Sequence, residues 1–104
     1  EINKKHIDFL LMMPNDLINL EISNGKIYFD GLRRLITIKR FLEKKELNPI
    51  SINEELKSIL KADYLFLRNN GNIEHRNLII VKKMMKKELI NINNLLKKIQ
   101  TQNE

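Results

Sequence analysis

The sequence predicts an all-α fold, a compact bundle of four to five helices with a long C-terminal helix. Apolar residues recur mostly at steps of three and four, which places them on one face of a helix. The chain has 3 Gly and 2 Pro in 104 residues, too few for the tight turns of a β-sandwich or barrel. This length fits one core, so we expect residues 1–104 to form a single domain.

The first quarter of the chain, residues 1–25, is predicted to hold two short helices. The first ends at Pro14, whose ring disfavours helical geometry in the residue before it. The second follows directly, with an apolar side that includes Leu17 and Ile18.

Three longer helices are predicted in the rest of the chain, over residues 26–46, 51–68 and 72–100. Ser51 and Glu54 match a capping box, in which the two side chains satisfy free backbone amides at the start of a helix. A polar, asparagine-rich loop with one glycine separates the last two helices.

The end of the last helix carries an apolar stripe with two interpretations. The stripe includes Leu89, Ile92, Leu95, Leu96 and Ile99. It can pack back on the first two helices, or it can form an exposed seam for a partner helix or a dimer.

The sequence offers little for catalysis, so we expect a non-enzyme without cofactor, metal or small-molecule substrate. With no Cys, disulfides, thiolate zinc sites and Cys nucleophiles are excluded. His6 and His75 fall in different helices without an acid motif nearby. Glu54 and Glu55 are adjacent and point about 100° apart on a helix, which does not suit a catalytic pair.

No segment of the sequence has the pattern of a membrane span or a signal peptide. The longest apolar run covers residues 9–13, far short of the ~20 residues that cross a bilayer. The absence of Cys also suits a reducing compartment. We therefore expect a soluble, intracellular domain with no membrane partner.

The chain is basic, with a net charge of +6, and this charge normally indicates nucleic acid, an anionic membrane surface or an acidic protein segment as partner. Ile, Asn and Lys supply 16, 14 and 14 residues, and all three have A/T-rich codons. Genome bias therefore explains part of the lysine excess. Arg, which pairs with phosphate and guanine in two-pronged contacts, numbers only 5.

Two groups of basic residues stand out, one on each of two predicted helices. The first is Arg33, Arg34, Lys39, Arg40, Lys44 and Lys45, and the second is Lys82, Lys83, Lys86, Lys87, Lys97 and Lys98. Each can be the solvated face that any amphipathic helix requires. Each can also be a binding surface for acidic protein or nucleic acid.

Two of the predicted helices share a recognisable spacing of residues. The positions that carry it are Ile50-Ser51, Ser58, Leu60, Tyr64 and Leu67-Arg68, followed after a polar loop by residues 80–88. This spacing resembles the N-terminal domain of the transcription elongation factor TFIIS, a fold shared with the integrase-binding domain of lens epithelium-derived growth factor. Residues 80–88 are similar to the family's Leu-Ala-Lys-x-Leu-Ile-Lys-Lys-Trp stretch. The sequence departs from the family at Leu56, where the helix-interior Leu is expected one residue earlier, at Lys61, where a Gly is usual, and at Glu88, where the Trp is usual.

This resemblance implies a nuclear, non-catalytic domain that docks short disordered segments of transcription regulators, with an aromatic residue anchored beside acidic ones. The groove would lie between the loop 48–51 and the loop 69–72. The residues expected to bind the partner are Arg33, Arg34, Ser51, Arg68, Asn70, Lys82 and Lys86. The alternatives are a basic helical module that binds nucleic acid, and a structural or assembly subunit that pairs through the last helix.

Overall fold

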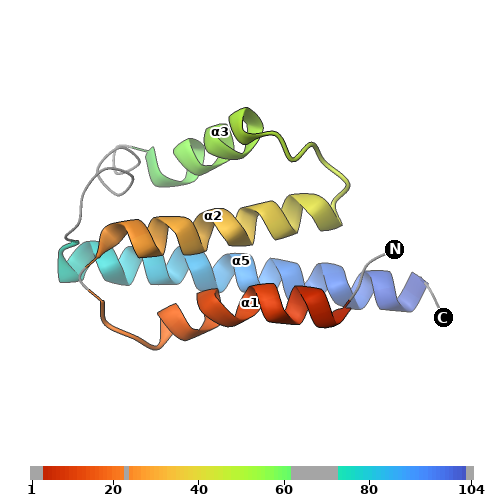
Figure 1. The fold of residues 1–104 in the computed structure, drawn as a ribbon, viewed down its shortest axis with the longest axis horizontal. Helices are drawn as coiled ribbons and strands as arrows, with labels where there is room; N and C mark the ends of the chain where they lie inside the picture. Colours follow the sequence, from red (N-terminus) through yellow and green to blue (C-terminus); the bar gives the residue numbers. More distant parts are fainter. Residues whose placement is uncertain (1–3, 23, 62–72, 103–104) are drawn as a thin grey trace.

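Helices account for most of the residues that the computed structural model describes, which are residues 4–22, 24–61 and 73–102. Within these residues the helices are α1 (Lys4–Ile18), α2 (Gly25–Leu42), α3 (Pro49–Leu60) and α5 (His75–Gln102). Helices α1 and α3 run in the direction opposite to α2 and α5 (Figure 1). The predicted all-α bundle with a long C-terminal helix is confirmed.

Helix α2 is at the centre of the bundle and packs against α5, α1 and α3. Its fully buried side chains include Tyr28, Leu32, Leu35 and Ile36. The other helices complete the core chiefly through Ile7, Leu11, Leu17, Ile52, Leu56, Leu60, Met85 and Ile92. These residues belong to the apolar stripes that the sequence predicts, because helical periodicity gathers them on inward faces.

Helix α1 runs through Pro14, so the predicted break and the two short helices in residues 1–25 are wrong. A proline inside a helix lacks the N–H that would bond to the carbonyl four residues earlier, here that of Leu10. The Arg34 guanidinium of α2 lies 3.5 Å from that carbonyl oxygen and donates to it. Pro14 is itself fully buried, so its packing and this outside donor offset the missing bond.

Tyr28 fixes the connection between α1 and α2. Its buried hydroxyl donates to the carbonyl of Leu20 at 2.9 Å and accepts the N–H of Ile22 at 3.1 Å. A buried hydroxyl with both functions satisfied avoids the cost of an unpaired polar group. Asn24 then caps α2, because its Oδ1 accepts the N–H of Lys26 at 3.0 Å.

Gly31 of α2 is packed closely by side chains from α1 and α5. A Cβ atom at this position would lie 2.9 Å from Cδ1 of Leu17 in α1 and 3.2 Å from Cε of Met85 in α5. Glycine inside a helix costs about 1 kcal/mol relative to alanine. Here it permits α1 and α5 to pack tightly on α2.

The end of α2 lies at Leu42, four residues before the predicted limit of 46. Lys44 has a φ of 60° and stops the helix in the left-handed conformation. The N–H of Lys45 bonds to the carbonyl of Arg40 at 2.9 Å, and the N–H of Lys44 bonds to that of Phe41 at 3.1 Å. This pair of bonds is a Schellman motif, with lysine at the position where glycine is usual.

Helix α3 begins at Pro49, so the predicted Ser51 and Glu54 capping box is wrong. Asn48 is the cap, and its Oδ1 accepts the N–H of Ser51 at 2.8 Å. Proline is favoured at the first position of a helix, where its missing N–H has no intrahelical partner to lose. The helix ends at Leu60, and residues 62–68 of the predicted helix lie outside the described residues.

The end of α5 packs back on the bundle, as in the first of the two interpretations of its apolar stripe. Leu89 and Ile92 are buried, while Leu95, Leu96 and Ile99 are half-buried against the core. Helix α1 contacts α5 in addition to α2. The apolar stripe is therefore largely used within the chain.

Candidate functional site

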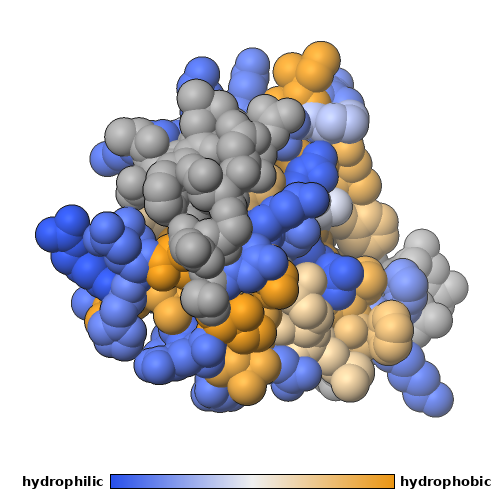
Figure 2. All heavy atoms as spheres, turned by 60° about the vertical axis from the view of Figure 1, so that its left-hand side comes forward, coloured by the Kyte–Doolittle hydropathy of each residue, from blue (hydrophilic) through white to orange (hydrophobic). Residues whose placement is uncertain are grey.

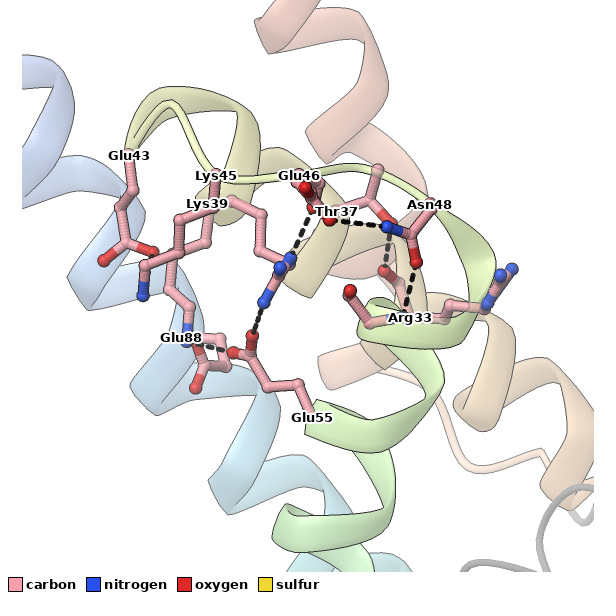
Figure 3. Close-up of polar contacts among 11 residues, drawn as sticks. Arg33, Thr37, Lys39, Glu43, Lys45, Glu46, Asn48, Glu55 and Glu88 are labelled. Carbon is pink, nitrogen blue, oxygen red and sulfur yellow. Dashed lines mark hydrogen bonds and ion pairs between the residues drawn. The ribbon is translucent and has the colours of Figure 1, made fainter.

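The predicted pair Arg33 and Arg34 does not form one basic surface. Consecutive residues in a helix point about 100° apart. Arg34 turns to α1, where it donates to the carbonyl of Leu10. Arg33 extends away from the part of α5 that carries Glu88 (Figure 3). The structure therefore does not bring this pair together with Lys82 and Lys86 of α5.

The structure describes only one side of the predicted groove, the side that contains Ser51. Ser51 is half-buried in the first turn of α3, and its backbone N–H is already bonded to Asn48. Ile50 beside it is 73% exposed. Arg68 and Asn70, which were predicted to form the opposite side, lie outside the described residues.

A network of ion pairs between largely buried side chains joins α2, α3 and α5. Lys39 Nζ lies 2.8 Å from Glu88 Oε2 and 3.0 Å from Glu55 Oε2. Arg40 Nη1 lies 2.8 Å from Glu55 Oε1, and its Nε donates to the carbonyl of Glu46 at 2.8 Å. Figure 3 shows Lys39 reaching between the two glutamates. The two cations are therefore committed to contacts within the fold.

The network changes the proton affinities of its members. Burial disfavours the charged form of Lys39, but the contacts with Glu88 and Glu55 outweigh it and raise the pKa of Lys39. Burial likewise disfavours the Glu55 carboxylate, but Arg40 and Lys39 outweigh it and lower the pKa of Glu55. Both pKa shifts mean that the charged form of each group is stabilised, as expected for paired groups of opposite sign.

Glu88 is the key residue of this network that was not predicted from the sequence. Its side chain is 9% exposed. The available signal was its place on the apolar stripe, three residues after Met85 and four before Ile92, amid a run of lysines. An acid on the buried side of a helix indicates a cation on the helix that packs against it.

The lysines on the outward side of α5 differ in environment from Lys39 and Arg40. We define the α5 outer face as Ile79, Ile80, Lys83, Lys86, Lys87 and Ile90, all exposed. None of its three lysines has an ion-pair partner among the described residues. Glu88, the one acid between positions 75 and 102 of the sequence, points into the bundle.

The other predicted lysine of α5, Lys82, is half-buried beside this face, while Lys97 and Lys98 are exposed further along the helix. The predicted residue Lys86 belongs to the face itself. The α5 outer face therefore combines positive charge that is unpaired in the described chain with three exposed isoleucines.

A second exposed apolar patch lies over α1. In Figure 2, apolar side chains gather in the lower part of the molecule, where α1 and its connection to α2 lie. Phe9, Met12 and Leu20 are 66%, 58% and 48% exposed. Asp8 and Asp16 are also exposed on this helix, so the patch lacks the uniform positive charge of the α5 outer face.

An open hollow of about 330 Å³ lies between α2 and α5. Its lining consists of Lys39, Glu43, Asn91, Asn94, Leu95 and Lys98. Within the described residues, no group of three or more His, Asp or Glu is placed to hold a metal ion. None of the helices that the structure describes is both long enough and apolar enough to cross a bilayer.

No family model, curated protein or solved structure matches the chain. The resemblance to the TFIIS N-terminal domain therefore stays a prediction.

Proposed function

We propose that the chain is a non-catalytic protein-interaction domain that docks short disordered segments rich in acidic and aromatic residues. The observation that carries the proposal is the α5 outer face, where exposed isoleucines lie among lysines and the helix exposes no acidic side chain. Transcription elongation or chromatin regulation in the nucleus is the setting that the sequence resemblance implies, and it is part of the proposal.

The chemistry of such a surface suits a segment with both acidic and apolar side chains. Carboxylates gain from lysines that have no competing partner, and this gain steers association as well as holding the complex. Apolar side chains of the segment would cover Ile79, Ile80 and Ile90. Because a disordered segment loses conformational entropy when it binds, the affinity should be modest.

A nucleic acid is a weaker match to the same surface. Phosphate binding uses the lysines but leaves the isoleucines without a role, and single-strand binding normally adds stacked aromatic side chains. Among the residues that the structure describes, the exposed aromatic side chains are Phe9 of α1 and Phe41 of α2, and neither lies on the α5 outer face.

Titration of the ¹⁵N-labelled chain with an acidic, Phe-containing disordered peptide tests the proposal. We expect saturable amide shifts that weaken with added salt, since screening reduces exposed charge pairs. The control is the same peptide with Asp and Glu replaced by Asn and Gln, which should bind much more weakly. Equal binding of both peptides, or no shifts with either, would contradict the proposal.

A further inference from the structure

The spacing along the α5 outer face defines a straight ridge. Ile79, Lys83, Lys86 and Ile90 follow one another at steps of four, three and four, so they share one side of the helix. The two isoleucines are 11 residues apart, which corresponds to about 16 Å along the axis, or three turns. At 100° per residue, Lys86 lies on one side of the line that joins them and Lys83 on the other.

The ridge is open in the folded chain. Ile79 is 45% exposed and Ile90 is 60% exposed, on a helix whose opposite side supplies buried core residues. These exposures are large for isoleucine, and they occur where every nearby charge on the same helix surface is positive. The complementary occupant is therefore apolar along its centre and negative along its edges.

We propose that the α5 outer face, rather than the predicted groove near Ser51, receives the partner, and that the partner segment folds there into an acidic amphipathic helix of about three turns. This inference rests on the proposed function and specifies its surface and the bound conformation. The partner helix lays apolar residues, spaced at three and four, along Ile79 and Ile90. Its carboxylates flank these residues and meet Lys83, Lys86 and Lys87.

A pair of synthetic peptides tests the conformation. Both contain the same Leu, Phe, Glu and Ala residues, but only the first places its apolar residues on one helical face. We expect the first peptide to gain helical circular dichroism on binding and to bind about tenfold more tightly than the scrambled one. Equal affinities, or binding without a gain in helix, would overturn the helical mode.

Paired variants of the chain test the surface. We expect Lys83→Glu/Lys86→Glu to weaken the first peptide about tenfold or more, whereas Lys26→Glu/Lys57→Glu, with the same change in net charge, weakens it less than about threefold. We expect Ile90→Ser to weaken it about fivefold and Met12→Ser, at a similarly exposed position of α1, to leave it unchanged. Circular dichroism of each variant checks that the fold is kept.

The outcomes separate the two proposals. Peptide binding that is insensitive to the α5 variants, with amide shifts near Ser51, would overturn the inference and leave the proposed function standing. Absence of binding by either peptide to the wild-type chain would overturn both. Tighter binding to duplex DNA than to the first peptide, unaffected by Ile90→Ser, would also overturn the inference, because it would identify phosphate as the ligand.

Discussion

The end of α2 and the outer face of α5 carry similar basic sequences, but their cations have different roles in the structure. Lys39 and Arg40 lie within 3.0 Å of carboxylates from α3 and α5. Lys83 and Lys86 are exposed and have no ion-pair partner among the described residues. A run of basic residues therefore indicates a binding surface only where the packing of other helices brings no acid to it.

The largest expected effect comes from removing Lys39. Lys39→Met leaves Glu88 and Glu55 facing each other with little solvent, and we expect it to lower the free energy of unfolding by about 3 kcal/mol. Urea denaturation at neutral pH measures this change. The matched change on α5, Lys86→Met, should stay within about 0.5 kcal/mol of wild type.

The double variant Lys39→Met/Glu88→Met sharpens the same comparison. It replaces the buried ion pair with apolar side chains of similar length, so most of the lost stability should return. A double variant as unstable as Lys39→Met alone would show that the network does not act through this pair.

The pH dependence of stability should follow from the two shifted groups. The lowered pKa of Glu55 means that its contribution is complete above its ordinary value of 4.5 and is lost as pH falls below it. The raised pKa of Lys39 means that its contribution is complete below 10.5 and is lost as pH rises through the folded-state value.

Thermal unfolding from pH 2 to pH 12 checks this window. We expect loss of stability at both ends, and in Lys39→Met we expect the alkaline loss to become smaller. In that variant the loss of stability at acid pH should also become smaller, because Glu55 keeps Arg40 but loses Lys39, so its carboxylate is stabilised less. An unchanged profile in the variant would contradict the assigned role of Lys39.

Arg34 has a smaller expected effect, and it belongs neither to the ion-pair network of Lys39 and Arg40 nor to the α5 outer face. Arg34→Met removes the donor to the Leu10 carbonyl, and we expect a loss of about 1 kcal/mol. In a Pro14→Ala background the helix supplies its own N–H, so the same change should cost less than half as much. Equal costs in the two backgrounds, measured by urea denaturation, would argue against this compensation.

The smallest expected effect is at the end of α2. Lys44→Gly relieves the left-handed conformation at φ 60°, and we expect a gain of about 0.5–1 kcal/mol in the free energy of unfolding. Lys45→Gly, at the next position, is the control and should bring no gain. A loss of stability in Lys44→Gly would mean that the lysine side chain contributes more than its backbone strain costs.

Much of the fold was predictable because helical periodicity depends on residues that are close together in the sequence. The inward stripes of α2 and α5 follow from their spacing alone. The break expected at Pro14 was wrong because the compensating donor, Arg34, is 20 residues away in sequence. The cap of α3 was misplaced because Asn48 and Ser51 are both competent caps, and the choice depends on Pro49 occupying the first helical position.

The candidate site was predictable only in part, for a related reason. Lys82 and Lys86 were correctly placed on one basic helix, but sequence could not distinguish them from Lys39. That distinction depends on Glu88 and Glu55, which reach Lys39 from two other helices. Ion pairing between helices depends on how the helices pack. A run of charges along one helix is therefore not sufficient to predict it.

The most direct test of the central claim is the affinity of the helix-forming acidic peptide for Lys83→Glu/Lys86→Glu, measured beside its free energy of unfolding. Our account predicts an affinity about tenfold weaker than that of wild type, with stability changed by less than about 0.5 kcal/mol. Unchanged affinity, or a loss of stability as large as that of Lys39→Met, would contradict the division of the cations into structural and partner-binding groups.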